Sequence, residues 1–364
     1  FEHIQAQIQE LASMGGQAVA EAVTVKTGAD LLEMSFPDNP LIGGLLDERE
    51  SLLVCGPSGL GKSVLTLNMA FSLAMPPMNG LWGAFDVPRP LKTAFIQSEN
   101  TAKATKKRIE KIIRANPSWR SALDRFAFPF VNDDLRLSGV LTETTFAAKV
   151  ERVVEETQSD VLILDPLISY HGEDENDNAA MRRSLDALTA ICDRLRVACI
   201  VVHHIGKTDD TGKATFSGRG ASAIGDWCAN ILSMNPVLDD RGERTNIIEM
   251  RHQKARNFEL RPRFYLERTA DLLMVPTDDP RDKEGRERVQ IVLDCLRDAG
   301  GSVESKSVLV GAVQEHTGKS RGTAQAMIAD AHKRGHIVFT PGKQNREGVA
   351  FANHANFEAG NSHV

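Results

Sequence analysis

One eight-residue stretch limits the possible folds of this chain more than any other feature. Residues 56–63 read Gly-Pro-Ser-Gly-Leu-Gly-Lys-Ser, which fits the pattern G-x-x-x-x-G-K-[ST]. That pattern requires a strand before the loop and a helix after it. An apolar run at Ser51–Cys55 and a helical pattern at Lys62–Ala74 supply both. The sequence therefore predicts a phosphate-binding loop at the end of a sheet strand.

The residue types of this loop suit a nucleotide that carries several phosphates. Glycines let the backbone turn so that its N–H groups point at phosphate oxygens, and the following helix directs its positive end at the same anion. Lys62 is expected to reach the β- and γ-phosphates, and the Ser63 hydroxyl to bind Mg²⁺. We therefore expect ATP and Mg²⁺ as cofactors. The residues expected to hold the nucleotide are Gly56, Pro57, Ser58, Gly59, Leu60, Gly61, Lys62, Ser63 and Val64.

Two other predicted strands end at a carboxylate. The apolar run Val161–Leu164 precedes Asp165, the position from which a nucleotide-binding sheet holds the water shell of Mg²⁺. The run Thr93–Ser98 precedes Glu99, and a carboxylate there can orient and deprotonate the attacking water. Taken alone, Asp165 would be better explained as the cap of a turn, and Glu99 could equally stabilise a helix N-terminus. Because it follows a phosphate loop, Asp165 is better explained as a metal-linked acid that acts together with Ser63.

A fourth strand, Val197–Val202, ends at His203 and His204. A polar residue at this place can respond to the γ-phosphate, although a strand-end histidine is often only a hydrogen-bonded structural residue. The pair does not suit zinc, because neighbouring residues of a strand point to opposite faces of the sheet.

The order of these elements predicts the fold class. Short runs rich in Val, Ile and Leu alternate with helical patterns, which is typical of a parallel sheet covered by helices on both faces. After a strand predicted at Ala229–Ser233, three further runs indicate a meander. The sequence thus predicts an α/β fold with a mostly parallel central sheet. The remaining predicted helices are Thr101–Ala115, Thr144–Thr157 and Asn178–Leu195, and the meander strands are Asn246–Met250, Arg263–Glu267 and Asp271–Val275.

Taken together, these motifs resemble the RecA-like P-loop ATPases, and among them the RepA-type hexameric replicative helicases of plasmids and mobile elements. The similar stretches occur in the family's order: Leu41–Leu46, the phosphate loop, Phe95–Asn100, Leu162–Leu167, Glu173–Arg182, His203–Lys207 and Arg219–Ala223. The resemblance implies Lys62 and Ser63 on the nucleotide, Glu99 as catalytic carboxylate and Asp165 as the acid linked to Mg²⁺. It also implies His204 as the sensor that links the ATP state to DNA.

One departure from that family concerns the cation that a neighbouring subunit supplies. The family can carry an arginine shortly after Arg219-Gly220, but here that place lies near Ala229, with no arginine beside it. The pair Lys254 and Arg256 resembles instead the fingers that RecA-like helicases insert into the adjacent subunit. Such cations stabilise transition-state charge and are worth ~10³–10⁵ in rate. The alternative is a solvated basic loop. If the pair are fingers, activity requires a closed ring, and the family implies a homohexamer.

A long polar segment, Gly206–Gly220, is the first candidate contact for DNA. It contains Lys207, Lys213 and Arg219 among Gly, Ser and Thr, and it is too long for a packed turn. Loops at this place line the central channel of RecA-like motors. The resemblance therefore implies that single-stranded DNA passes these three cations.

The C-terminal region has its own pattern of three helices and a hairpin, which resembles a winged helix. The predicted helices are Arg288–Ala299, Ser305–His316 and Arg321–Arg334, and the hairpin strands are Ile337–Thr340 and Val349–Phe351. Residues 319–346 carry six basic residues and one acid, a charge of +5, in a chain of net charge −6. Four of these basic residues lie where such domains contact a groove or backbone: Arg321, Lys333, Lys343 and Arg346. We expect duplex DNA there, with protein contact as the alternative.

These boundaries divide the chain into five parts. Residues 1–35 form an arm, either mobile or docked on another subunit, and residues 36–276 form the RecA-like ATPase domain. A polar linker at 277–285 leads to the winged-helix-like domain at 286–353, and a tail follows at 354–364.

Composition narrows the classes of protein that fit. With 41% hydrophobic and 25% charged residues, the chain resembles an ordinary globular protein, and aromatic residues at 5% argue against a large base-stacking surface. No apolar run approaches ~18 residues, no basic leader precedes an apolar core, and the five cysteines are scattered. We therefore expect a cytoplasmic protein that does not enter a membrane.

Two functions remain at this stage. The first is a ring-forming replicative helicase that translocates on single-stranded DNA by hydrolysing ATP. The alternative is a RecA-like ATPase that serves as a DNA-binding regulator, replication initiator or defence protein without unwinding DNA. DNA-stimulated ATP turnover combined with unwinding would separate the two.

Overall fold

The computed structural model describes residues 24–35, 40–77, 80–173, 177–204, 219–341 and 347–352. The chain divides into two units, Phe1–Asn39 and Pro40–Val364. In the first unit, the short helix α2 (Gly28–Glu33) begins with a capping box between Thr27 and Asp30. The side chains of Leu31 and Leu32 in this helix are exposed. The predicted role of this arm stays a prediction.

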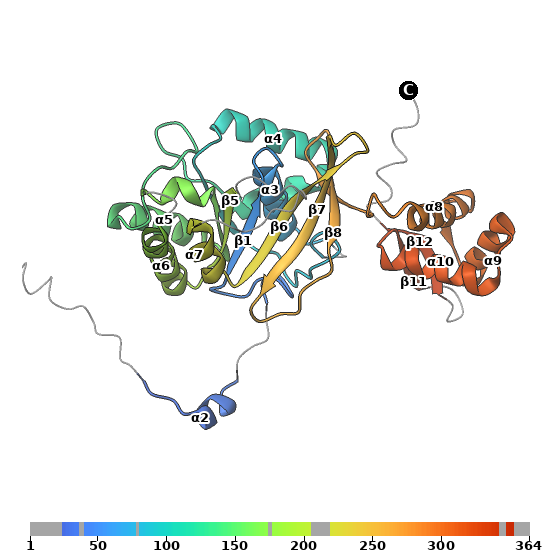
Figure 1. Cartoon of the computed structure of the whole chain (residues 1–364), viewed down its shortest axis with the longest axis horizontal. Coiled ribbons are helices and arrows are strands. Elements are labelled where there is room, and N and C mark those ends of the chain that lie inside the picture. The colour runs from blue at the N-terminus through green and yellow to red at the C-terminus, as the bar shows by residue number, and fades with distance from the viewer. Residues whose placement is uncertain are drawn as a thin grey trace, which may run out of the picture. The chain divides into compact units, whose positions relative to one another are not determined.

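The second unit is built on a nine-stranded sheet (Figure 1). Its strands are β1 (Ser51–Gly56), β2 (Thr93–Gln97), β3 (Phe126–Ala127), β4 (Val161–Asp165), β5 (Ala198–His204), β6 (Asn230–Leu238), β7 (Arg244–Ala255), β8 (Phe264–Arg268) and β9 (Met274–Thr277). They follow the order β3-β2-β4-β5-β1-β6-β7-β8-β9. From β3 to β6 neighbouring strands are parallel, and from β6 to β9 they are antiparallel. The predicted α/β fold with a mostly parallel sheet is confirmed.

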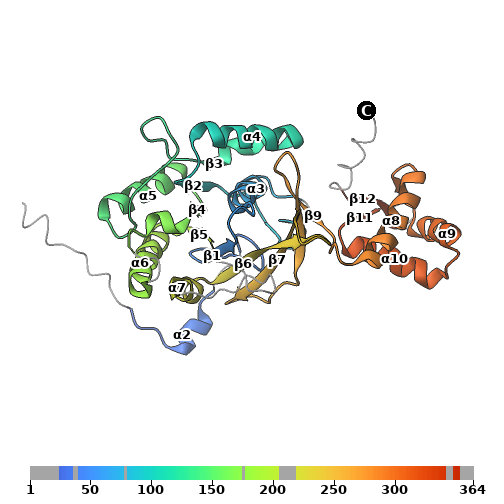
Figure 2. The same ribbon diagram turned by 45° about the horizontal axis from the view of Figure 1, so that its top comes forward.

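Helices cover both faces of this sheet because its central strands are apolar on both sides (Figure 2). In β1, Leu52 and Val54 belong to one core, and Leu53 and Cys55 belong to the other. The first core receives α3 (Lys62–Ala74) and α4 (Ala102–Ala115); the second receives α5 (Thr144–Thr157), α6 (Asn178–Leu195) and α7 (Arg219–Trp227). Burial on both faces explains the near-continuous hydrophobic runs in the sequence.

Two sequence expectations about this sheet need correction. The two-residue strand β3 and the 3₁₀ segment η1 (Pro117–Arg125) were not predicted, because neither is long enough to show a period. The strand expected at Asp271–Val275 is β9, which begins only at Met274. Leu272 has φ 66° in a turn that starts at Thr269, and this left-handed backbone is incompatible with a strand.

The C-terminal domain has a hydrophobic core of its own. Its elements are α8 (Lys283–Asp298), β10 (Ser302–Val303), α9 (Lys306–Thr317), α10 (Arg321–Lys333), β11 (Ile337–Pro341) and β12 (Glu347–Phe351). The three strands pair in the order β10-β12-β11. Ser320 caps α10 by accepting a hydrogen bond from the Thr323 N–H. The predicted three helices and hairpin are present, with the short strand β10 added, and α8 begins inside the predicted linker. Classification as a winged helix stays a prediction.

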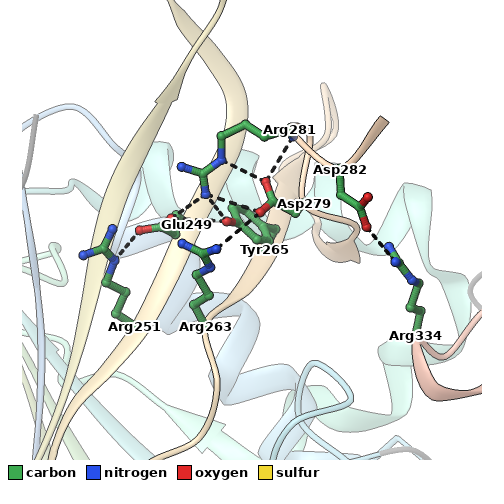
Figure 3. Close-up of polar contacts among 8 residues, drawn as sticks. All are labelled: Glu249, Arg251, Arg263, Tyr265, Asp279, Arg281, Asp282 and Arg334. Carbon is green, nitrogen blue, oxygen red and sulfur yellow. Dashed lines mark hydrogen bonds and ion pairs between the residues drawn. The ribbon is translucent and has the colours of Figure 1, made fainter. Parts of the chain in front are cut away.

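The connector between β9 and α8 is held by charged residues on both sides (Figure 3). Toward the large sheet, Arg281 bonds the buried Glu249 of β7 at 2.9 Å and also contacts the Tyr265 hydroxyl. Toward the C-terminal domain, Asp282 accepts a 2.6 Å hydrogen bond from Arg334. Arg334 also contacts Asp330 at 2.9 Å and Asp278 at 3.5 Å. The basic cluster predicted at 319–346 therefore loses Arg334, whose charge is already paired.

Replacing Arg334 with Gln should lower the Tm of the C-terminal domain by about 5–10 °C at pH 7, because the substitution removes the cation that Asp278, Asp282 and Asp330 share. Burial opposes ionisation of Asp278, but hydrogen bonds from His336 and Arg334 hold its pKa below the ordinary 3.8. Because the pKa of Asp278 is lower in the folded state, its ionised carboxylate stabilises the fold above pH 3.8. This contribution disappears as the pH falls through the pKa of the folded state. In thermal unfolding from pH 7 downward, the difference in Tm between the two proteins should therefore begin to shrink once the pH falls below 3.8. A constant difference in Tm would contradict the pairing.

Candidate nucleotide site

The phosphate loop lies between β1 and α3, as predicted, and its glycines are required by its geometry. Gly59 and Gly61 have φ values of 77° and 96°, in the left-handed region that favours glycine. A side chain at Gly56 would meet the Met234 carbonyl oxygen at 2.7 Å. The loop can therefore keep its curl and its close approach to β6 only with glycine at these positions.

Lys62 is buried within the loop that it is expected to serve. Its Nζ donates hydrogen bonds to the carbonyl oxygens of Gly56 at 2.7 Å and Pro57 at 2.9 Å. Burial lowers the pKa of this lysine to about 8, and the nearby Asp165 carboxylate opposes the shift. The ammonium group is thus positioned by the backbone and desolvated, which strengthens its interaction with a phosphate.

Asp165 ends β4 and is 3% exposed. One of its carboxylate oxygens, Oδ2, has no hydrogen-bond partner among the described residues. Burial raises the pKa of this carboxyl to about 6, although a hydrogen bond from the Ser63 hydroxyl opposes the shift. Mg²⁺ prefers oxygen ligands and usually keeps several waters, so this oxygen and the Ser63 hydroxyl fit that ion. Within the described residues, no cluster of three or more His, Cys, Asp and Glu side chains could hold another metal.

The sheet register brings the other predicted residues to the same edge. Gly56 pairs with His204 across β1 and β5, and Gln97 pairs with Asp165 across β2 and β4. Glu99 lies two residues beyond Gln97, and its Oε1 is 3.9 Å from Nε2 of His204. Burial lowers the pKa of His204, which favours the neutral ring. A half-exposed carboxylate and a neutral imidazole thus face each other beside the phosphate loop.

His203 takes no part in this arrangement. Its side chain is buried, and burial lowers its pKa to about 4. The adjacent imidazole of His204, by contrast, is 39% exposed. The two rings have different environments, as expected for neighbours in a strand.

Arg108 of α4 also belongs to this site, although the sequence analysis missed it. It lines a small cavity together with Ser63, Gln97, Asn100 and Asp165. Its charge also opposes the rise in the pKa of Asp165 that burial causes. A single arginine in a helix rich in basic residues gives no sequence signal of its own. Its position nine residues after Glu99, one turn beyond the buried Thr105, is the only pattern that could have indicated it.

Lys254 and Arg256 do not join the phosphate loop of their own chain. Lys254 Nζ donates to the carbonyl oxygens of Gly225 at 2.8 Å and Asp226 at 3.2 Å, and Arg256 contacts the latter at 3.3 Å. These carbonyls are at the C-terminal end of α7, where cations interact favourably with the helix dipole. Both residues therefore lie beside Ala229, one residue before β6 begins, whereas the phosphate loop follows the other end of the parallel strand β1.

The residues predicted to bind DNA are only partly described. Lys207, Lys213, Lys343 and Arg346 lie outside the described residues, as does the side chain of Arg219 at the start of α7. Arg321 and Lys333 are exposed at opposite ends of α10. Their predicted role is compatible with this exposure and stays a prediction.

Comparison with known proteins places the nucleotide site in a family. A model of the AAA domain family matches residues 21–210. No curated protein matches the chain. Among solved structures, the KaiC-like protein PH0186 from the hyperthermophilic archaeon Pyrococcus horikoshii OT3 is 15% identical, with 65% of this chain and 93% of that chain covered and a TM-score of 0.46. The RadB recombinase is 16% identical, with 64% and 92% covered and a TM-score of 0.43. Neither likeness is close enough to indicate function. Within the described residues, no helix is long and apolar enough to cross a membrane.

Proposed function

Because this chain belongs to the AAA domain family and is a RecA-like P-loop ATPase, we propose that it is a replicative DNA helicase that works as a ring. The observation that carries the proposal is the convergence of Lys62, Asp165 and Glu99 at one sheet edge with His204 beside them. This set combines phosphate binding, a metal-linked acid, a candidate base and a polar residue that can respond to the nucleotide.

Each residue has a distinct task in the proposed hydrolysis of ATP. The backbone of the phosphate loop and Lys62 hold the β- and γ-phosphates, and Ser63 and Asp165 hold Mg²⁺. When bound, Mg²⁺ neutralises charge on the phosphate oxygens. Glu99 orients the attacking water and accepts its proton, for which its exposed carboxylate is suited. His204 contacts Glu99 from the neighbouring strand and so can transmit the state of the nucleotide to the chain that follows β5.

The position of Lys254 and Arg256 supports assembly into a ring. They lie at the end of the sheet where β1 begins, and a six-residue strand is about 20 Å long. They are therefore too far from their own phosphate loop to stabilise charge there. A neighbouring subunit that places this end against the phosphate loop would complete the site with two cations. A homohexamer is the closed arrangement that the family resemblance implies.

The proposed helicase has two contacts with DNA. Single-stranded DNA passes Lys207, Lys213 and Arg219, which follow His204 along the chain. Duplex DNA meets the C-terminal domain at Arg321, Lys333, Lys343 and Arg346, four of the five basic residues of 319–346 that remain after Arg334 is excluded. The first contact couples DNA to hydrolysis, and the second recruits the motor to its substrate.

The test is to measure ATP turnover and strand displacement with the same preparation. The proposal expects turnover stimulated by single-stranded DNA, and displacement of a labelled strand from a forked duplex that requires ATP and Mg²⁺. Lys62→Ala serves as the inactive control. ATP turnover without strand displacement would favour a DNA-binding regulator, initiator or defence protein. Mass measurement with ATP present would test for six subunits.

A further inference from the structure

The strongest concentration of positive charge on this chain lies on the ATPase domain. Residues 103–125 contain eight basic residues and two acids, a net charge of +6 in a chain of −6. This exceeds the +5 of residues 319–346, from which Arg334 is withdrawn by its carboxylates. The basic residues are Lys103, Lys106, Lys107, Arg108, Lys111, Arg114, Arg120 and Arg125.

Four of these cations form one exposed row along α4. Lys103, Lys107 and Lys111 are four residues apart, so they share a face of the helix, and Arg114 continues the row. All four are exposed. Among the solvent-facing cations of α4 in the described part of the chain, only Lys106 is paired, with Glu110 at 3.8 Å. The row is about 16 Å long at 1.5 Å per residue. Figures 1 and 2 both show α4 at the outer side of the domain.

A groove of about 690 Å³ lies between α4 and η1, and Arg114 is the member of the row that lines it. Its floor is apolar and includes Ile109, Leu123 and Phe128. The charged residues that line the groove are Arg114 and Arg120, together with Lys106 and its partner Glu110. An apolar floor inside a cationic rim suits a ligand with an anionic backbone and flat apolar groups.

We propose that the α4–η1 face binds single-stranded nucleic acid. The row on α4 contacts phosphates, and unstacked bases lie against the apolar floor of the groove. An isolated acidic side chain or a short anion would need only one or two cations. The four cations recur every three or four residues, about 5–6 Å along the helix, so a flexible backbone with many phosphates can contact several of them at once. A duplex keeps its bases stacked inside and would leave the floor uncovered.

This surface is separate from the channel segment at Lys207–Arg219 and from the C-terminal domain. Binding at this face requires neither unwinding of DNA nor a ring of subunits. The inference can therefore be correct or wrong independently of the proposed helicase. Because α4 also carries Arg108 into the nucleotide cavity, a strand bound on its outer face lies one helix away from Asp165.

The test neutralises the row in the full-length protein with Lys103→Gln, Lys107→Gln, Lys111→Gln and Arg114→Gln together. Glutamine keeps helix propensity and side-chain length. The matched control removes four charges from exposed cations of α5 and α6: Lys149→Gln, Arg152→Gln, Arg182→Gln and Arg194→Gln. Anisotropy is measured on an oligothymidine of about 20 nucleotides across a salt series, and on a duplex of equal length. Thermal unfolding and binding of a fluorescent ATP analogue confirm that each variant is folded.

The α4 variant should bind the single strand at least tenfold more weakly at ~0.1 M salt, and its log–log salt slope should fall by about 3. The control variant should lose much less, because its four cations lie on α5 and α6 and three of them are paired with carboxylates. Equal losses in both variants, or unchanged binding in the α4 variant, would overturn the inference. A loss confined to duplex, or displacement of the strand by polyglutamate at lower concentration than by unlabelled oligothymidine, would also overturn it. In those cases the face would bind duplex or an acidic protein instead. If the wild-type protein fails to displace a strand, only the proposed helicase function is contradicted.

Discussion

Lys62→Ala is expected to reduce ATP turnover by at least ~10³-fold, because the substitution removes the lysine that is proposed to hold the β- and γ-phosphates. The fold should survive. The curl of the loop depends on Gly56, Gly59 and Gly61, whose backbone positions exclude other residues, and not on the lysine side chain. The loss of two hydrogen bonds to the loop carbonyls should change the Tm by only a few degrees. Phosphate release and thermal unfolding, measured on the same sample, check both statements.

Glu99→Gln provides the matched contrast to this variant. It should also lose turnover, but it should keep its affinity for ATP, because the carboxylate acts on water and does not hold the phosphates. The Glu99 side chain is 53% exposed, so its replacement should not disturb the packing of the domain. Equilibrium binding of a fluorescent ATP analogue separates the two variants. An equal loss of ATP affinity in both would show that Glu99 binds nucleotide and is not the base.

The sequence predicted the sheet well because its strands are buried on both faces. β1, β4 and β5 appear as short, uninterrupted apolar runs, and such runs end where the phosphate loop, Asp165 and His204 begin. Segments whose ends are set by the backbone conformation of a turn were harder to predict. The start of β9 depends on the left-handed backbone of Leu272, which no propensity indicates for a leucine.

The site was predictable as a list of residues but not as an arrangement. Strand-end motifs identified Lys62, Asp165 and Glu99, whereas the contact between Glu99 and His204 follows from the register of non-consecutive strands. Arg108 was missed because a helix with many basic residues looks like a solvated surface. The row on α4 was missed for the same reason, because exposed lysines on a helix are typical of an ordinary solvated surface. Arg334 is the opposite case: it was counted in the positive charge of residues 319–346, but in the fold its charge is paired with Asp282.

Arg256 is the proposed finger, the cation that one subunit supplies to the nucleotide site of its neighbour. Arg256→Ala should lower turnover by ~10³-fold or more in a pure preparation, because each site would lack the cation that stabilises transition-state charge. Its phosphate loop stays intact. Lys62→Ala has the opposite defect, an intact Arg256 and a defective phosphate loop. If the finger acts between subunits, the two inactive variants complement each other when they are mixed. In a one-to-one mixture with random assembly, about a quarter of the interfaces combine an intact loop with an intact finger, so about a quarter of wild-type turnover should return.

The control for this experiment mixes Arg256→Ala with the double variant Lys62→Ala/Arg256→Ala, which supplies no finger and should restore nothing. The contacts of Arg256 make the comparison necessary. Its guanidinium bonds the Asp226 carbonyl at the end of α7, so alanine could act simply by loosening that helix end. A local defect of that kind stays within the subunit and cannot be repaired by a partner with a defective phosphate loop. Recovery in the first mixture alone therefore assigns Arg256 to the neighbour's site. No recovery, with Tm values equal to wild type, would show that the cation serves only the α7 end and that another residue completes the site.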